Sequence, residues 1–129
     1  MDVKVGVSVI LIRNNNEILI GKRKGSHGAG MFSVPGGHLE YGETFEECCS
    51  RELEEEIGVK LNDFDKIGFS EDFFEEKQYT TLYFKKYIDS NIEIINLEPE
   101  KCEEWIWVNK DNLPKLFCDT NNQIAINVR

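Results

Sequence analysis

The chain has 129 residues, and its 24 acidic against 15 basic side chains give it a formal net charge of −9. This length fits a single domain, while the acidic balance argues against binding to a nucleic acid polymer, which would require a basic surface. The chain contains no apolar run near the roughly 18 residues of a membrane span, and its N-terminus lacks the plan of a signal peptide. We therefore expect a soluble, cytoplasmic protein that does not associate with membranes.

The first third of the chain predicts a β-hairpin and a series of loops. β-branched and apolar residues, with period-two alternation at the start, are typical of strands, and segments with this character occur at 3–13, 18–20 and, briefly, 32–35. Clusters of asparagine, glycine and other small residues predict turns or loops at 14–16, 22–30 and 36–42. The two longer strands should therefore form a hairpin.

Residues 44–57 form the best-defined predicted helix. Thr44, with Glu47 three positions later, matches a capping box, and Gly58 is a natural C-terminal stop. Apolar side chains recur every four positions between these ends, at Phe45, Cys49, Leu53 and Ile57. They give the helix one apolar stripe that must pack against the rest of the protein.

The remaining elements are several strands and one further short helix. Apolar and aromatic patterns predict strands at 64–74, 79–88, 105–107 and, more weakly, 92–95. Residues 111–117 contain a proline suited to a first helical turn, whereas the pattern at 121–129 favours no element. Strands on both sides of one long helix indicate a mixed α/β domain.

Negative charge is concentrated in and around the predicted helix. Residues 40–56 hold eight glutamates and a single cation, Arg51. Positions three and four apart lie together on a helix, so Glu52, Glu55 and Glu56 share an arc that borders the apolar stripe. If partly buried, two such carboxylates repel by about 3 kcal/mol, and a divalent cation such as Mg²⁺ or Mn²⁺ would remove this repulsion. The alternative is an ordinary solvated acidic face.

Neighbouring residues strengthen the prediction of a ligand site. Gly36 and Gly37 leave the backbone open to close approach by an ion or ligand, and Glu43 lies at the entrance of the helix. Arg51 is adjacent to Glu52 and is suited to pair with a carboxylate and hold its orientation. The sequence therefore predicts that the site lies where the glycine pair meets the acidic helix.

From Gly37 onward, these residues resemble the Nudix family. The segment 37–59 matches every fixed position of the pattern G-x5-E-x7-R-E-U-x-E-E-x-G-U, in which U is aliphatic. The similarity extends over residues 3–117, with runs such as VPGGHLE at 34–40 that look like the MutT-type nucleoside triphosphate diphosphatases of animals and plants. The resemblance implies one Nudix domain over residues 1–129, folded as an α/β/α sandwich around a mixed β-sheet.

The resemblance also implies a reaction and a metal site. We expect Mg²⁺-dependent cleavage of nucleoside triphosphates, oxidised purine deoxynucleotides among them, to the monophosphate and pyrophosphate, with Mn²⁺ able to substitute. The implied catalytic residues are Arg51, Glu52, Glu55 and Glu56, and the implied metal ligands are Gly36, Glu52, Glu55, Glu56 and Glu100. Glu52 acts either as a ligand or as the base that activates water. Glu103 and Glu104 are alternatives to Glu100 as the acid that completes the metal site.

Substrate contacts are expected from segments that precede and follow the acidic helix in the sequence. The expected substrate-binding residues are Arg23, Gly36, Gly37, His38, Tyr83 and Phe117. Arg23 suits phosphate oxygens, and Tyr83 and Phe117 offer aromatic rings to a purine base; the alternatives are a solvated basic turn and ordinary core packing. Relatives place an aromatic residue after the position of Phe117, where this chain has Cys118, so the base preference is open.

Three further expectations accompany the leading one. A Nudix hydrolase of another diphosphate (a dinucleotide, a nucleotide sugar or a prenyl diphosphate) would show the same pattern, because the pattern handles the diphosphate and not the group attached to it. A non-catalytic nucleotide-sensing module should carry damaged acidic positions, and none is damaged here. The family resemblance also favours a homodimer.

Overall fold

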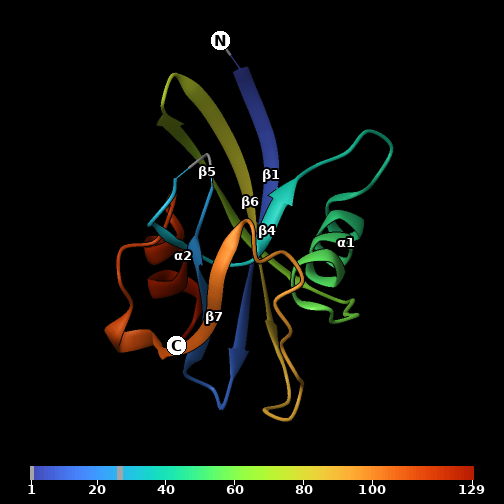
Figure 1. Ribbon diagram of the computed structural model, residues 1–129, viewed down its shortest axis with the longest axis vertical. Helices are drawn as coiled ribbons and strands as arrows, with labels where there is room; N and C mark the ends of the chain where they lie inside the picture. Colours follow the sequence, from blue (N-terminus) through green and yellow to red (C-terminus); the bar gives the residue numbers. More distant parts are fainter. Residues whose placement is uncertain (1, 26–27) are drawn as a thin grey trace.

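The computed structural model describes residues 2–25 and 28–129, which fold into a mixed β-sheet with a helix on each face (Figure 1). The strands are β1 (Asp2–Arg13), β2 (Glu17–Arg23), β3 (Phe32–Ser33), β4 (Gly36–His38), β5 (Asp65–Phe74), β6 (Lys77–Tyr87) and β7 (Cys102–Asn109). The helices are α1 (Phe45–Ile57) and α2 (Thr120–Asn127), with a 3₁₀ turn, η1, at Lys110–Asn112. The predicted α/β/α arrangement is confirmed. Among the described residues, no helix has the length and apolar character needed to cross a membrane.

Strand β1 organises the sheet because it changes partners along its length. On one side it runs parallel to β6, from the pair Asp2–Lys77 to the pair Ile12–Tyr87. On the other side it is antiparallel to β4 in its first half and to β2 at its end. Strand β5 pairs with β6, and β7 pairs with β2. The sheet therefore divides into two arms beside β1, with β4 on one arm and β2 with β7 on the other.

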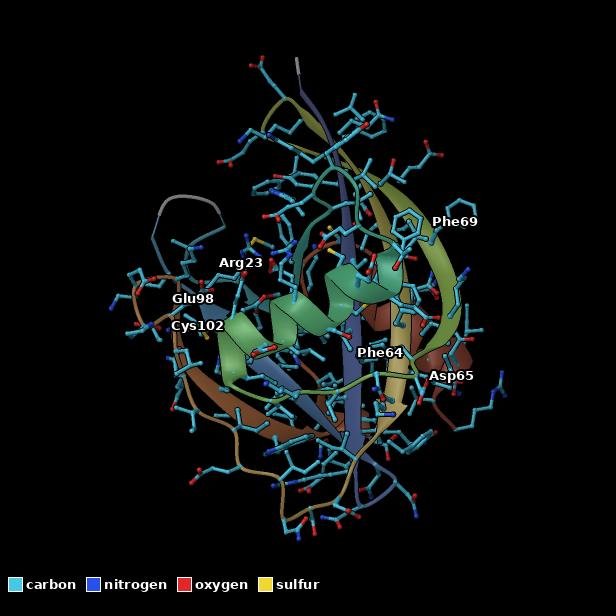
Figure 2. The ribbon with its side chains drawn as sticks, turned by 90° about the vertical axis from the view of Figure 1, so that its right-hand side faces the viewer. Arg23, Phe64, Asp65, Phe69, Glu98 and Cys102 are labelled. Carbon is cyan, nitrogen blue, oxygen red and sulfur yellow. The ribbon has the colours of Figure 1, made fainter. Side chains whose placement is uncertain are left out.

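Alternation along β1 divides the core into two clusters. Val7, Val9 and Leu11 pack with the apolar stripe of α1, whereas Ile10 and Ile12 face the other way, toward α2. All five side chains are at most 3% exposed, and burying each contributes about 1.5–3 kcal/mol relative to exposure. Figure 2 shows α1 in front of the sheet and α2 behind it. Strand β1 thus fixes both helices.

Helix α1 begins and ends where the sequence predicts. The Thr44 side chain accepts a hydrogen bond from Glu47 N (3.1 Å), and the Glu47 carboxylate accepts one from Thr44 N (2.7 Å), which completes the capping box. Gly58 ends the helix in a left-handed conformation (φ 72°) that glycine adopts without steric penalty. The acidic residues of the helix are therefore held at fixed positions over the sheet.

Strand β4 lies where the sequence predicts a loop. Gly36 and Gly37 pair with Ser8 and Val7 of β1, because the two backbones approach more closely than side chains would allow. A Cβ at Gly36 would overlap the Val7 carbonyl oxygen. The sheet therefore requires glycine at position 36. The backbone that the sequence predicts to be open to a ligand belongs to a strand, not to a loop.

Other boundaries also differ from the sequence prediction. Strand β2 extends into the first glycine-rich loop, whose residues 26 and 27 lie outside the described part of the chain. No strand forms at 92–95, because Ile95 N bonds to Ile57 O at the end of α1 (3.1 Å). The short helix expected around Pro114 is reduced to η1, since the residue before a proline disfavours helical backbone. The C-terminal segment, for which no element was predicted, forms α2.

Candidate active site

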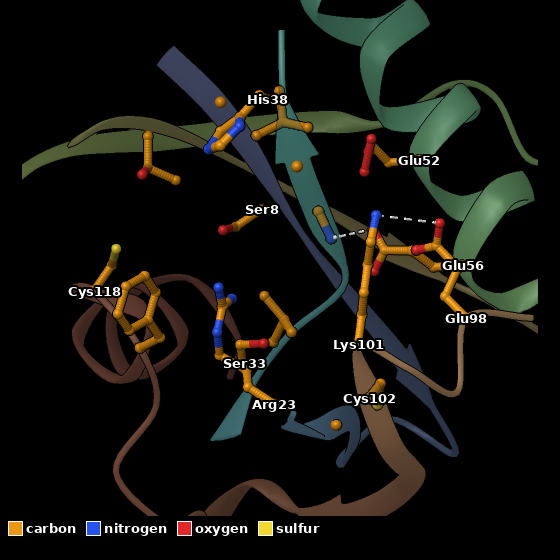
Figure 3. Close-up of a pocket in the computed structure, with 18 of the residues that line it drawn as sticks. Ser8, Arg23, Ser33, His38, Glu52, Glu56, Glu98, Lys101, Cys102 and Cys118 are labelled. Carbon is orange, nitrogen blue, oxygen red and sulfur yellow. Dashed lines mark hydrogen bonds and ion pairs between the residues drawn. The ribbon is translucent and has the colours of Figure 1, made fainter. Parts of the chain in front are cut away.

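A cavity of about 650 Å³ lies between α1, β4 and the segment that precedes β7 (Figure 3). Carboxylates of α1 line one end, and aromatic and hydroxyl side chains from β6 and the segment before α2 line the other. The predicted site residues that line it are Arg23, Gly36, Gly37, His38, Arg51, Glu52, Glu55, Glu56 and Phe117. The fold thus brings together the predicted site residues other than Glu100 and Tyr83.

Glu52 and Glu56 form a carboxyl pair at the acidic end of the cavity. They are one helical turn apart, and their carboxyl groups hydrogen-bond to each other. Glu52 lies against the α-carbon of Gly37, where a Cβ would overlap its carboxylate, and Gly36 N donates to Glu56 Oε2 (3.4 Å). Burial raises the pKa of both groups, and the hydrogen bond and charge of Glu52 raise the pKa of Glu56 further. The pair is therefore suited to accept a proton or a cation.

Glu98, and not Glu100, lies at the acidic end of the cavity. The segment before β7 follows the end of α1, with Leu97 N bonded to Glu56 O (3.0 Å). This path places Glu98 beside the carboxyl pair (Figure 3). The charge of Glu98 contributes to the raised pKa of Glu56, and Lys101 Nζ lies 3.6 Å from the Glu98 carboxylate.

Glu100, which the sequence predicts as a metal ligand, lies apart from the carboxyl pair of Glu52 and Glu56. Glu100 lies in an exposed turn and does not line the cavity. Its rivals Glu103 and Glu104 are also exposed and outside the lining. The sequence signal for Glu98 is Pro99, because a residue before a proline favours extended backbone and the turn begins only at the proline.

Arg51 joins the acidic helix to strand β4. Its guanidinium makes a two-point contact with Glu43 (3.0 and 2.7 Å) and donates to Glu52 Oε1 (2.8 Å) and Glu55 Oε1 (3.2 Å). It also donates to the carbonyl oxygen of His38 (2.9 Å). Glu55 is half exposed at the rim of the cavity. Arg51 therefore orients Glu52, which is the role that the sequence analysis expected of it.

We expect Glu43→Gln to lower the free energy of unfolding by about 1–3 kcal/mol at neutral pH. The hydrogen bonds from Arg51 lower the pKa of Glu43 to about 2, from an ordinary value of 4.5, so the ionised group favours the folded state. This stabilisation is complete above the ordinary value and is lost as the pH falls toward 2. Urea unfolding of wild type and variant should therefore give stabilities that converge in acid.

Glu46→Gln is the matched control for this prediction. Glu46 is an exposed residue in the first turn of the same helix, so its replacement should change the free energy of unfolding by less than about 0.5 kcal/mol. It should also leave the pH dependence of stability as in wild type. A deficit in Glu43→Gln that stays constant from neutral pH into acid would contradict the role given to the Arg51 contact.

Aromatic residues form the other end of the cavity. Phe117 lies edge-on to Tyr79 (ring centroids 5.8 Å), and the Arg23 guanidinium stacks over the Phe117 ring (4.6 Å). Thr81 and Cys118 also line this wall, and Figure 3 shows Arg23 and Cys118 beside the same space. Arg23 and Phe117, both predicted to contact the substrate, therefore lie together in this wall.

Tyr83, which the sequence predicts to stack on a base, does not line the cavity. Its side chain is 0% exposed, and its hydroxyl bonds to Ser70 Oγ and Asp119 N. Tyr79 lies on the same face of β6, four residues nearer the start of the strand. It lines the cavity, whereas Tyr83 does not. The sequence places both tyrosines on one face but does not show which of them the segment before α2 covers.

The acidic end suits a hard divalent cation such as Mg²⁺. Among the residues that the structure describes, no three His, Cys, Asp or Glu side chains are already arranged as metal ligands. The acidic donors that line the cavity here, Glu52, Glu56 and Glu98, nevertheless offer only oxygen atoms, which Mg²⁺ and Mn²⁺ prefer. Glu52 and Glu56 lie one helical turn apart and the charge of Glu52 raises the pKa of Glu56, so a divalent ion between the two carboxylates would remove their repulsion.

Comparison with known proteins identifies the family. The NUDIX domain matches residues 2–126. The chain belongs to the Nudix family. The 8-oxo-dGTP diphosphatase of Escherichia coli K12 is 40% identical over 83 residues, 63% of this Nudix chain and 64% of that protein. The NAD-capped RNA hydrolase NudC of Vibrio atlanticus is 38% identical over 60 residues, 46% of this chain and 22% of that protein. The chain thus spans less than two-thirds of either relative's length.

A solved structure shares the fold of this Nudix protein. The MutT NUDIX hydrolase from Burkholderia pseudomallei matches it with a TM-score of 0.87 at 24% identity, with 100% of both chains covered. Together with the sequence match to the Escherichia coli protein, this confirms the resemblance to MutT-type proteins. The expected tie to animal and plant enzymes finds no support, because these relatives are bacterial.

Proposed function

We propose that this Nudix protein is an enzyme that hydrolyses nucleoside triphosphates to the nucleoside monophosphate and pyrophosphate, with Mg²⁺ or, in its place, Mn²⁺. The observation that carries the proposal is the half-buried carboxyl pair of Glu52 and Glu56, at one end of a cavity whose other end is aromatic. The likeness to an 8-oxo-dGTP diphosphatase supports oxidised purine deoxynucleotides as substrates.

The acidic end is where the phosphate chemistry would take place. The proposed metal ligands are oxygen atoms of Gly36, Glu52, Glu55, Glu56 and Glu98. When bound, the ion would neutralise phosphate oxygens and lower the pKa of the attacking water. Burial raises the pKa of Glu52, which suits a base that takes a proton from water, while its contact with Glu56 suits a ligand. In either role, its 2.8 Å hydrogen bond from Arg51 fixes its orientation.

The rest of the cavity would bind the substrate. Arg23 and Lys101 line it and would supply positive charge for phosphate oxygens, and His38, at the end of β4, also lines the cavity. The nucleoside would lie against Phe117 and Tyr79, since stacking of a base on an aromatic ring contributes about 1–3 kcal/mol. The glycines of β4 place no side chain between the two ends of the site.

We expect Glu98→Gln to lower kcat for nucleoside triphosphates about 30-fold, or about 2 kcal/mol of transition-state stabilisation. The change removes a charge next to the carboxyl pair and keeps the shape of the side chain. Glu100→Gln is the matched control, because Glu100 is exposed and outside the cavity, and its kcat should stay within about twofold of wild type. Steady-state kinetics with saturating Mg²⁺ measures both; equal losses would remove the distinction between the two acids.

A substrate panel tests the proposed reaction. Wild type and Glu56→Gln are incubated with Mg²⁺ and with natural and oxidised nucleoside triphosphates, and the products are separated by ion-exchange chromatography. We expect monophosphate and pyrophosphate from wild type and almost no product from the variant. Release of nucleoside diphosphate and phosphate would contradict the proposed bond, and equal activity of the two proteins would contradict the site.

The second candidate substrate is a diphosphate that joins a nucleoside to another group. The relative named for NAD-capped RNA favours this class, which includes dinucleotides, nucleotide sugars and prenyl diphosphates. The ratio of kcat/KM values across a panel that contains both classes decides between them. A non-catalytic nucleotide-sensing module is the remaining alternative, and tight nucleotide binding without product release would support it.

The homodimer implied by the family resemblance and the cytoplasmic location expected from the sequence stay predictions. Size-exclusion chromatography with light scattering measures the mass in solution, for which the chain mass of 14.9 kDa is the reference. A mass near that value would rule out the dimer. Fractionation of cells that express the protein tests the location.

A further inference from the structure

A chain of hydrogen bonds runs from the segment before α2 into the sheet. Asp119 N donates to the hydroxyl of Tyr83 (3.1 Å), that hydroxyl lies 2.9 Å from Ser70 Oγ, and Ser70 Oγ donates to Asp72 Oδ2 (2.6 Å). Because Ser70 gives its only hydroxyl proton to Asp72, Tyr83 must donate to Ser70 and accept from Asp119. Burial raises the pKa of Tyr83 to about 12, so the hydroxyl keeps its proton at neutral pH. The Asp72 carboxylate therefore sets the direction of the chain.

The far end of this chain supports a strained turn. Cys118 precedes Asp119 and has a positive φ of 62°, a conformation that is unfavourable for a residue with a side chain. Phe117 N bonds to a carbonyl oxygen of β3 (2.8 Å), and Thr120 Oγ1 donates to Phe117 O (2.8 Å). The bond from Asp119 N to Tyr83 adds a tie to β6, the strand that lies beside β1 in the middle of the sheet.

The same turn holds the aromatic wall of the cavity. Phe117 lies edge-on to Phe74 (5.2 Å) and to Tyr79 (5.8 Å), and the Arg23 guanidinium covers its ring (4.6 Å). Cys118 faces the cavity beside them (Figure 3). A shift of the turn would therefore displace this wall. It would leave the carboxyl pair in place, because that pair belongs to α1 on the other face of the sheet.

We infer that Tyr83 is a positioning residue for nucleoside recognition: its hydroxyl holds the turn that presents Phe117 and Cys118 to the base of the substrate. This inference rests on the proposed function. Tyr83 is fully buried and does not line the cavity, so it acts through the turn. Its removal should weaken the affinity that depends on the base and leave the phosphate chemistry unchanged.

Steady-state kinetics of Tyr83→Phe separates these two effects. For a nucleoside triphosphate we expect KM to rise about tenfold, with kcat within about a factor of two of wild type. Ribose 5-triphosphate has the same phosphate chain and no base, so its inhibition constant as a competitor should stay unchanged. Tyr87→Phe is the matched control, because Tyr87 lies on the same strand and is 46% exposed; it should behave as wild type in both measurements.

Hydrogen exchange gives a readout that needs no catalysis. The Asp119 amide is bonded to Tyr83, so its exchange should quicken at least about tenfold in Tyr83→Phe and stay as in wild type in Tyr87→Phe. If circular dichroism shows that Tyr83→Phe does not fold, Ser70→Ala replaces it in the kinetic test. That variant removes the acceptor of the Tyr83 proton, and KM for the nucleotide should rise about threefold.

Two results would overturn the inference. One is a KM for the nucleotide that does not change in Tyr83→Phe, or in Ser70→Ala where that variant is used. The other is an equal loss of affinity for the nucleotide and for ribose 5-triphosphate, which would mean that the whole site has been disturbed. A wild type that neither binds nor hydrolyses any nucleotide refutes the proposed function and removes the inference with it, even when Asp119 exchanges faster in the variant.

Discussion

Glu56→Gln is expected to lower kcat/KM for the best nucleotide substrate about a thousandfold, or about 4 kcal/mol of transition-state stabilisation. The variant keeps the shape of the side chain and removes the charge that would hold the cation. The same change should raise the free energy of unfolding by about 1 kcal/mol when divalent cations are removed with a chelator. A half-buried carboxyl group beside Glu52 opposes folding, and a neutral amide lessens that opposition. Enzyme kinetics and urea unfolding measure the two effects.

Glu54→Gln is the matched control on the same helix. Glu54 is exposed, and its contact with Lys60 at 3.9 Å is a surface ion pair that contributes about 0–1 kcal/mol. The control should keep full activity and near wild-type stability. An active Glu56→Gln, or one that loses stability in the chelator, would show that Glu56 does not carry the metal-binding role proposed here.

Gly37→Ala is expected to lower kcat/KM about a hundredfold and the free energy of unfolding by only about 1 kcal/mol. An added Cβ would overlap the Glu52 carboxylate, which is the flexible end of a side chain and can move aside. The carboxylate would then leave Glu56 and its hydrogen bond from Arg51. Activity should therefore be lost while the fold persists, as measured by kinetics and urea unfolding of the same preparation.

A neighbouring glycine and a double-mutant cycle provide the controls. At Gly36 the added Cβ would overlap the Val7 carbonyl oxygen, which belongs to the backbone, so Gly36→Ala should destabilise the protein by about 3 kcal/mol. In a Glu52→Gln background, Gly37→Ala should reduce kcat/KM further by less than about threefold, because both changes act through one side chain. Fully additive losses would place the effect of Gly37 elsewhere.

Local patterns predict the parts of this protein that depend on local geometry. The capping box at Thr44 and the left-handed Gly58 form as expected, because each needs only residues within one or two turns. The contact between Glu52 and Glu56 follows from the helical spacing alone. The pairing of Arg51 with these acids was also foreseen, since it lies on the same helix.

Choices that depend on the path of distant segments could not be made from the sequence. Whether Glu98 or Glu100 reaches the acidic end depends on how the segment before β7 follows α1, which is fixed by backbone bonds such as Leu97 N to Glu56 O. Tyr83 lies on the face of β6 that carries Tyr79, which lines the cavity, but the turn before α2 covers Tyr83 itself. The sequence predicts a loop at the glycine pair, because the residues of β1 with which it pairs lie about thirty positions earlier in the chain and local patterns do not show that pairing.

The change of partners along β1 has an evolutionary consequence. Residues on one face of the sheet would perform hydrolysis, and residues on the opposite face would select the nucleoside, so a part of the second task is encoded apart from the first, at the end of the gene. The C-terminal stretch, from Phe117 onward, would contribute to selection and contains none of the acids proposed to bind metal. A duplicated copy can therefore acquire a new preferred molecule through mutations there, while inheriting the bond-breaking apparatus intact.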